Sequence, residues 1–240
     1  RPLVRRATAD GVLDPQDLLA VAQTLQVARR LKGFLEGHRA RAPRLAAVGG
    51  WIIPLDSLEG AIATVLDEEG QVRDDASATL RRVRTEQRTL DRRIRGAVEG
   101  VLRNPAYSQM LQESLITVRG DRFVVPIRQE AKGQFPGIVH DQSSSGATVF
   151  MEPLAIVPLG NRRRELAATE REEIHRLLLA LSRAVAAEAE AITSTLEALG
   201  AVDLALAKAS LSERFGCSEP ALTEAGALLL RAARHPLLLI

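Results

Sequence analysis

The chain of 240 residues contains one cysteine, Cys217, and only 3% aromatic residues. A single thiol excludes an internal disulfide, and the scarcity of aromatic rings leaves little scope for the stacking surfaces of single-strand binders. The sequence has no apolar run near the ~18 residues of a membrane span, and we find no secretory signal pattern. These absences predict a cytoplasmic protein without a membrane partner.

Motifs that hold nucleotides or metals are also missing. There is no GxxxxGK[ST] motif, so the chain is not expected to cradle a nucleoside triphosphate. One cysteine and four scattered histidines make no ligand cluster for a metal. His140, Asp141 and Ser143 are neighbours in sequence, but a catalytic triad is defined by geometry. We therefore expect no catalytic, cofactor or metal site.

The charge is nearly balanced, with 32 Lys and Arg against 30 Asp and Glu and a formal net charge of +2. The basic residues are nearly all arginine, the exceptions being Lys32, Lys132 and Lys208. Non-specific capture of nucleic acid depends on neutralising phosphates. Any contact with nucleic acid must therefore come from local groups of residues.

Residues 1–72 are predicted to form the first part of a helical core. Asp14 and Pro15 can begin a helix that Gly37 ends. Residues 38–54 contain prolines and a glycine pair, which predicts a connection, and a shorter helix follows over residues 55–67.

Residues 73–104 predict a first long arm. Apolar positions recur at intervals of four and three residues, which is the heptad pattern of a coiled-coil seam. Asn104-Pro105 ends the helix, because proline disfavours helix in the residue before it. The seam positions are Ala76, Leu80, Val83, Gln87, Leu90, Ile94, Ala97 and Val101.

A second arm is predicted over residues 159–199, which hold no proline and one glycine, Gly160. After Gly200, another helix should run over residues 202–215, within a second core part at 200–240. The start at Arg1 and the apolar end suggest a segment cut from a longer chain. Because the two arms flank the β-patterned insertion, they should run antiparallel and pack along their seams.

Residues 105–158 form a β-patterned insertion between the arms, here called the clamp segment. Gly120-Asp121 separates two strand-like runs, residues 116–119 and 122–128, and is a two-residue hairpin signal. Pro126 cannot donate to a strand ladder, which predicts an edge strand or a bulge.

A second strand pair is predicted at residues 137–140 and 147–151, with a turn at 141–146. The fold class is thus mainly α with a small β insertion, an α+β protein. Its parts would be a helical core, two long antiparallel lever helices and a small antiparallel β clamp at their tip.

Candidate contacts to nucleic acid lie in the clamp segment. Arg119, Arg122, Arg128 and Lys132 could form a small basic face, although acidic residues are interspersed with them, so the segment carries no net basic patch. The loop Ser143, Ser144 and Ser145 could meet phosphate, or it could be a polar turn whose hydroxyls bond their own backbone.

Two other patterns that suggest a function also have a structural interpretation. Arg119-Gly120-Asp121 spells an adhesion tripeptide, which a tight turn explains better. The arginines of the first arm could follow a nucleic-acid backbone, or they could flank a coiled coil with Glu86, Asp91 and Glu99 as partners.

Residues 116–153 resemble the clamp of the bacterial MutS-two family. The similarity is carried by DRFVVPIRQE at 121–130 and GIVHDQSSSGATVFMEP at 137–153. The stretch at 67–90 is similar to the family's first lever arm, and AARHPLL at 232–238 is similar to its lead-in to the ATPase domain.

The resemblance implies a core, lever and clamp region that precedes an ATPase needing ATP and Mg and, usually, a nuclease module of the Smr type. The chain would hold neither catalytic site. The resemblance also implies a homodimer that binds branched DNA and suppresses recombination, or one that engages stalled or collided ribosomes through rRNA and helps to split them. The residues alone also allow a structural coiled-coil spacer without a ligand.

Overall fold

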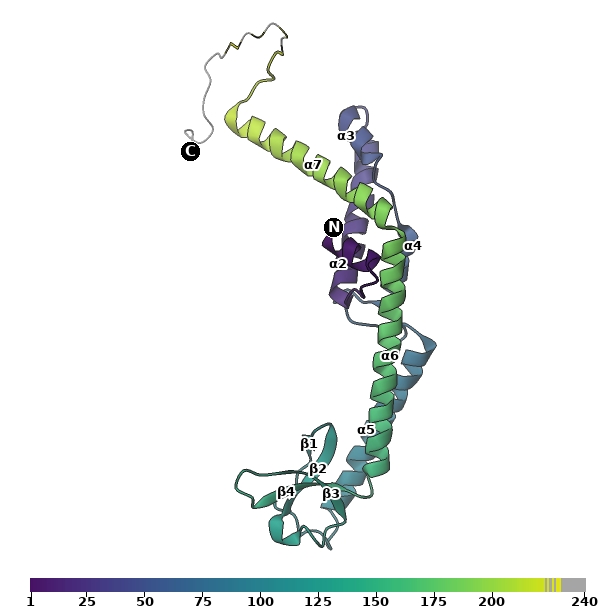
Figure 1. Ribbon diagram of the computed structural model, residues 1–240, viewed down its shortest axis with the longest axis vertical. Helices are drawn as coiled ribbons and strands as arrows, with labels where there is room; N and C mark the ends of the chain where they lie inside the picture. The colour runs from purple at the N-terminus through teal and green to yellow at the C-terminus, as the bar shows by residue number, and fades with distance from the viewer. Residues whose placement is uncertain (223, 225, 227, 230–240) are drawn as a thin grey trace. The chain divides into compact units, whose positions relative to one another are not determined.

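The computed structural model describes residues 1–222, 224, 226 and 228–229 (Figure 1). Within them lie seven α-helices and a four-stranded antiparallel sheet, which confirms the predicted α+β class. The run at 232–238 lies outside the described residues. The chain divides into two compact units. Unit 1 comprises residues 1–11, 20–59 and 183–240, and unit 2 comprises residues 12–19 and 60–182.

Unit 1 is helical, and its small buried cluster joins Ala28, Ile52 and Ala198. The structure corrects the predicted connection at 38–54, which contains a short helix begun by a proline at its first position. The helices that lie wholly or partly in this unit are α1 (Pro2–Thr8), α2 (Pro15–Gly37), α3 (Pro43–Gly49), α4 (Asp56–Val65), the end of α6 (Val157–Ala187) and α7 (Ala189–Phe215).

The predicted helix over 159–199 is wrong at its end. The chain breaks at Glu188, where φ is −98° and ψ is 18°, and α7 then continues through Gly200 to Phe215. No residue near Glu188 is a helix breaker, so tertiary packing decides the break. The buried Thr195 accepts a hydrogen bond from the Ile53 N–H at 3.2 Å, which ties α7 to the segment after α3.

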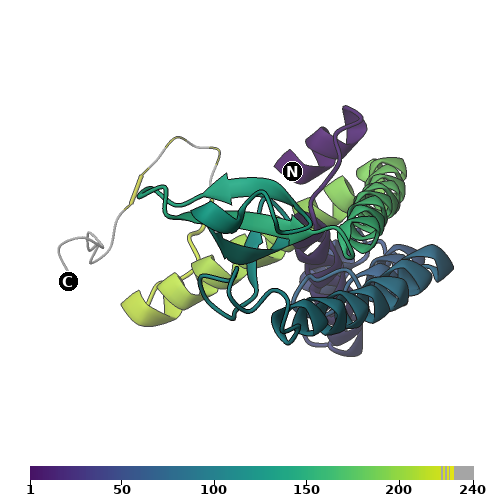
Figure 2. The same cartoon turned by 90° about the horizontal axis from the view of Figure 1, so that it is seen from below.

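Unit 2 contains α5 (Ala78–Leu102) and most of α6, which run antiparallel beside one another (Figures 1 and 2). Ser77 caps α5 by accepting the Leu80 N–H at 3.0 Å, which satisfies one of the helix's unpaired donors. Leu80, Val83, Leu90 and Ile94 are buried as the heptad pattern predicts. Val98 is buried as well, while Ala97 and Val101 are only partly buried.

The sheet lies at the end of the pair where α5 stops and α6 begins (Figure 1). Its strand order is β1-β2-β4-β3, and every pair is antiparallel. A short 3₁₀ turn at Gln129–Ala131 follows the second strand. The strands are β1 (Thr117–Arg119), β2 (Arg122–Arg128), β3 (Gly137–Gln142) and β4 (Thr148–Pro153).

The predicted hairpin at Gly120-Asp121 is confirmed. The two residues have φ of 53° and 62°, the positive values that a tight hairpin turn of the I′ type requires. The second hairpin is also confirmed, with Gly146 at a φ of 72° in its turn. A register shift between Val139 and Asp141 marks an irregularity in β3.

Pro126 does not mark an edge strand, since β2 lies between β1 and β4. β1 pairs only with β2 residues up to Val124, so it does not reach the proline. Beyond it, the Pro126 carbonyl accepts the N–H of Gln112 at 2.9 Å. A residue's N–H and C=O point to the same side in an antiparallel strand. The side of Pro126 that lacks an N–H therefore faces residues 110–112, and the ladder with β4 loses no hydrogen bond.

The core of unit 2 joins the sheet to both helices. Val125, Ile127 and Met151 share one buried cluster with Ile94 of α5 and Leu166 of α6. Each such side chain contributes about 1.5–3 kcal/mol when fully buried. The sheet is thus held to the helix pair by apolar packing. Among the described residues, no helix combines the length and apolarity needed to cross a membrane.

Candidate nucleic-acid interface

Arg122, a predicted contact, is buried and therefore does not belong to an exposed interface. Its Nη1 donates to Glu152 Oε1 at 3.0 Å and its Nη2 donates to Asn161 Oδ1 at 2.8 Å. Glu152 is also buried, and its other oxygen lies 2.8 Å from His140 Nε2. These contacts tie β2, β3 and β4 to the start of α6.

Gly160 makes room for this ion pair. A Cβ at that position would lie 2.7 Å from Glu152 Oε1 and 2.9 Å from Arg122 Nη1. Both distances are shorter than a carbon–oxygen or carbon–nitrogen contact allows. The only glycine within the predicted second arm therefore has a packing role.

Arg119 is partly exposed on β1 and is held from two sides. Its Nε lies 3.2 Å from Asp141 Oδ2, and its guanidinium carbon lies 4.5 Å from the centroid of the Phe150 ring. A guanidinium over an aromatic face is a favourable electrostatic arrangement. Both contacts favour this orientation of the side chain.

Arg128 and Lys132 are exposed near the 3₁₀ turn. The Arg128 Nε donates to the Leu111 carbonyl at 3.3 Å. Arg128 lines a shallow cavity of 560 Å³ together with Glu130. Arg119 lines a different pocket of 270 Å³, which Ser143 also lines.

Ser143, the first residue of the serine loop, agrees with the prediction of a polar turn bonded to its own backbone. Ser143 Oγ accepts the Thr148 N–H at 3.1 Å, and the Ser143 carbonyl accepts the Gly146 N–H at 2.8 Å. Ser144 and Ser145 are exposed at the hairpin tip. The structure thus brings Arg119 and Ser143 to one pocket, and it separates them from Arg128 and from the buried Arg122.

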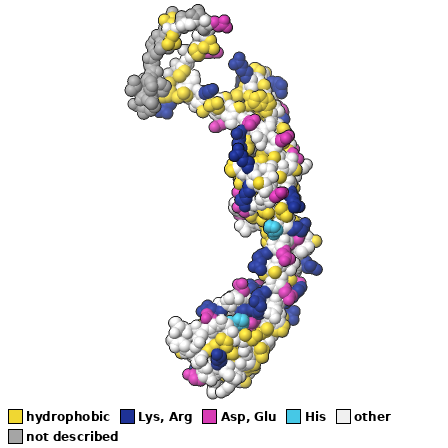
Figure 3. Space-filling view, in the orientation of Figure 1, with side chains coloured by type: hydrophobic (Ala, Val, Ile, Leu, Met, Phe, Trp, Pro, Cys, Tyr) yellow, Lys and Arg dark blue, Asp and Glu magenta, His cyan; other side chains and the backbone are white. Residues whose placement is uncertain are grey.

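Basic and acidic side chains both lie on the visible face of the sheet region (Figure 3). On the face shown in Figure 3, dark blue and magenta side chains lie among white and yellow ones around the sheet. This agrees with the expected absence of a net basic patch. Sequence reasoning missed Phe150, Gln112 and Glu113, which line the same pocket as Arg119. The β4 alternation that places Phe150 opposite Asp141 is the signal that could have found it.

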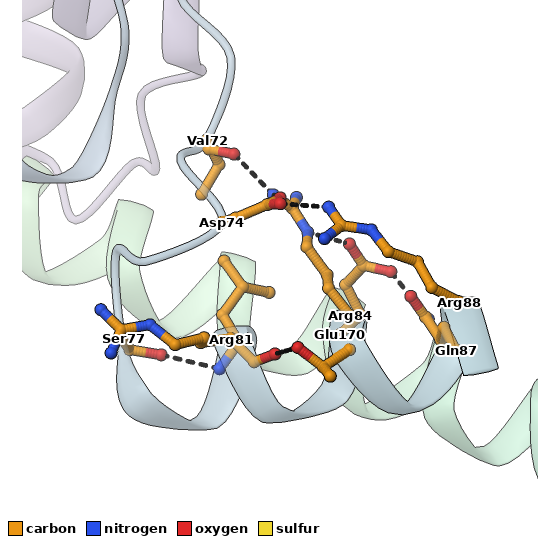
Figure 4. Close-up of polar contacts among 10 residues, drawn as sticks. Val72, Asp74, Ser77, Arg81, Arg84, Gln87, Arg88 and Glu170 are labelled. Carbon is orange, nitrogen blue, oxygen red and sulfur yellow. Dashed lines mark hydrogen bonds and ion pairs between the residues drawn. The ribbon is translucent and has the colours of Figure 1, made fainter.

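The helix pair is joined by ion pairs, the central one at Arg84 (Figure 4). Arg84 Nε donates to Glu170 Oε1 at 2.7 Å, and its Nη1 donates to Asp74 Oδ1 at 2.6 Å. Gln87 donates to the second oxygen of Glu170 at 2.9 Å, and Arg88 also pairs with Asp74. Burial acts to raise the pKa of Glu170, but the hydrogen bonds from Arg84 and Gln87 outweigh it and lower that pKa.

Glu173 forms a second tie between the helices. It accepts hydrogen bonds from Arg176 at 2.8 and 2.7 Å and from the Ser77 hydroxyl at 2.6 Å. These bonds, the arginine's first, lower the pKa of Glu173 to about 2. The residue that caps α5 therefore also binds α6.

Two acidic residues of the first arm, Glu86 and Asp91, have their partners on α6. Arg162 Nε lies 2.9 Å from Glu86 Oε1, and Arg163 Nε lies 3.0 Å from Asp91 Oδ1. Glu99 pairs locally with Arg103 at 3.6 Å. These pairs support the interpretation that the arm's arginines and acidic residues flank a coiled coil. The pairs form between α5 and α6 as well as at the end of α5. No group of residues suited to a metal ion occurs in the described part of the chain.

Comparison with known proteins finds similarity over nearly the whole chain, although no family model matches it. A protein of Symbiobacterium thermophilum named "Endonuclease MutS2" is 45% identical over 238 residues, covering 99% of this chain and 30% of that protein. Proteins of the same name from Shouchella clausii and Geobacillus sp. are 42% and 38% identical, each over 99% of this chain and 31% of the relative.

The chain spans about 30% of the length of these curated relatives. The matched region covers 99% of the chain and therefore includes the helices and the sheet, residues 116–153 among them. The antiparallel helix pair and the sheet at its end are the features that the sequence assigned to lever and clamp. The chain belongs to the bacterial MutS2 family, as a segment of its members' longer sequence.

Proposed function

We propose that this segment is the core, lever and clamp region of a MutS2 protein and that its sheet engages nucleic acid. The observation that supports this best is the sheet held at one end of an ion-paired helix pair, with Arg128, Lys132 and the tip serines exposed. Such a support fixes where the exposed groups lie relative to the helices.

The mechanical part of the proposal follows from the helix pair. α5 has 25 residues and α6 has 31, and apolar packing and Arg84–Glu170 resist sliding of one past the other. A displacement at one end of the pair would then reach the sheet. ATP and Mg would act in the remainder of the protein, which we propose is a homodimer. In this segment, the helical core would comprise residues 1–72 and 200–240. The lever arms would be residues 73–104 and 159–199, and the clamp would be residues 105–158.

Branched DNA is the target we favour, with suppression of recombination as the outcome. The same phosphate chemistry fits a ribosome, and engagement of stalled or collided ribosomes through rRNA is the second candidate. A third role, as a spacer without a ligand, predicts no binding. The segment itself would be non-catalytic in each case.

Salt-dependent binding tests the first role. We expect this chain to bind a four-way DNA junction with an affinity that falls as salt rises, because phosphate contacts release counterions. Replacing Arg128 and Lys132 by alanine should weaken binding and reduce the salt slope by up to ~1 for each lost phosphate contact. Arg41→Ala with Arg44→Ala, an exposed pair in unit 1, is the matched control.

A deletion separates DNA from ribosome. Residues 105–158 are replaced by a Gly-Ser linker in a complete MutS2 protein, and binding to junctions and to collided ribosomes is measured with ATP. Loss of junction binding alone supports the first role, and loss of ribosome binding alone supports the second. Unchanged binding to both contradicts a clamp in this segment.

A further inference from the structure

The pocket beside Arg119 has a mixed lining that includes an aromatic ring. It has a volume of 270 Å³ and is walled by Phe150, Arg119 and Thr148, with Gln112 and Glu113 on the segment before β1. The lining thus combines an aromatic ring, a cation, a hydroxyl, an amide and a carboxylate. That combination differs from the exposed cations expected of a purely phosphate-binding surface.

Arg119 and Phe150 form a stacked pair in this pocket. The guanidinium carbon lies 4.5 Å from the ring centroid, and Asp141 holds the guanidinium from the side at 3.2 Å. Unpaired bases stack on aromatic rings and on guanidinium planes, with little regard to sequence. The ion pair with Asp141 favours the arrangement in which the guanidinium lies over the ring.

Glu113 adds a negative charge and hydrogen-bond acceptors to the pocket. Its carboxylate is exposed at the pocket, and with Asp141 nearby it repels a phosphate entering there. The same carboxylate accepts hydrogen bonds from an exocyclic amino group, such as N4 of cytosine. Thymine offers no amino group. An amino-bearing base would thus gain a hydrogen bond at Glu113 that a phosphate or a thymine would not.

A base inside a duplex cannot use this pocket. Its faces are stacked on neighbours and its amino group is paired, so only an extruded or unpaired base can enter. Ser143 lines the pocket, and the exposed Ser144 and Ser145 follow it at the hairpin tip. Serine hydroxyls can donate hydrogen bonds to the phosphates of a bound strand.

We propose that this pocket holds an unpaired, amino-bearing nucleobase, stacked on the Arg119–Phe150 pair and bonded to Glu113. The inference rests on the proposed contact with nucleic acid and narrows it. Duplex phosphates would provide general affinity, and the pocket would select branches or gaps where a base is free.

Three four-way junctions test it with the whole chain: one fully paired, one with two unpaired cytosines at the branch and one with two unpaired thymines. We expect the cytosine junction to bind at least fivefold tighter than the paired one. 2-Aminopurine at the unpaired position should lose fluorescence on binding, as stacking quenches it. The same set in RNA shows whether the sugar matters.

Two variants test whether the preference for unpaired cytosine depends on this pocket. Phe150→Leu should bring the cytosine advantage below twofold while paired-junction binding is unchanged. Glu113→Gln should remove the preference for cytosine over thymine. Glu130→Gln, an exposed carboxylate in the other cavity, should change neither, and thermal unfolding confirms that every variant folds.

The outcomes separate the two proposals. Equal binding of all three junctions overturns the base pocket and leaves the proposed clamp standing, as does a cytosine preference that survives both pocket variants. Absence of binding to every junction overturns both. An advantage that Phe150→Leu and Glu113→Gln remove, and Glu130→Gln does not, supports the pocket.

Discussion

Arg122 and Glu152 form a buried ion pair, with their nearest atoms 3.0 Å apart, beneath a glycine of α6. The pair joins the second and fourth strands, and Asn161 and His140 extend it to the helix and to the third strand. A residue that sequence reasoning offered as a ligand contact is thus part of the joint between sheet and helix pair.

Gly160→Ala should destabilise unit 2 by about 1–3 kcal/mol, the range for overpacking a well-filled site. The added Cβ would press on Glu152 and Arg122. Gly96→Ala on α5 is the matched control, because nothing lies within 4 Å of its Cβ position. That change should stabilise by about 0.5–1 kcal/mol. Urea unfolding measures both, and equal effects of the two changes would contradict the packing role of Gly160.

Arg122→Met should cost about 3–5 kcal/mol, because it leaves the Glu152 carboxylate buried without its cation. Changing both residues to methionine should restore part of that loss, since no charge then remains in the site. Chemical unfolding of the two single variants and the double variant gives the coupling energy. A single variant as stable as the parent chain would show that the pair is solvated instead of buried.

Acid should weaken the tie at Glu173. Its pKa is lowered from 4.5 to about 2 in the folded chain, so the stabilisation is fully present above about pH 4.5 and is lost as the pH falls towards 2. Glu173→Gln should be less stable near pH 7 and should lose less stability between pH 5 and 3. Unfolding free energies across that range provide the check, and parallel pH profiles would exclude the effect.

Ion pairs between α5 and α6 should differ in strength with their burial. Arg84 and Glu170 are mostly buried and hydrogen-bonded, so a double-mutant cycle should give a coupling of about 1–3 kcal/mol. Arg162 and Glu86 are nearly half exposed, and exposed pairs contribute about 0.2–1 kcal/mol. Equal couplings in the two cycles would contradict this order. Added salt should reduce the second coupling more than the first.

The helix pair was predictable because its pattern is local. Spacings of four and three residues place Leu80, Val83, Leu90 and Ile94 on one face of a helix, and the structure buries all four. Ser77 is a side chain that readily caps a helix. The Gly120-Asp121 turn was predictable for the same reason, since positive φ at both positions favours these residue types.

The break at Glu188 was not predictable, because the residues around it are good helix formers. Contacts distant in sequence, such as Thr195 with Ile53, decide where α7 lies. Gly200 suggested a boundary, yet it continues the helix at the modest cost of a glycine. Local propensity is weak beside the burial of a helix face.

The candidate site also combines features that the sequence predicts with features that only the tertiary structure decides. The sequence alone determined the family, the α+β class, the two hairpins and the mixed charge of the clamp segment, because these follow from residue order. Only the tertiary structure decided that Arg122 is buried with Glu152 and that Arg119 is stacked on Phe150. Whether a cation faces solvent or a carboxylate depends on which strands and helices pack together. Local sequence patterns do not determine that packing.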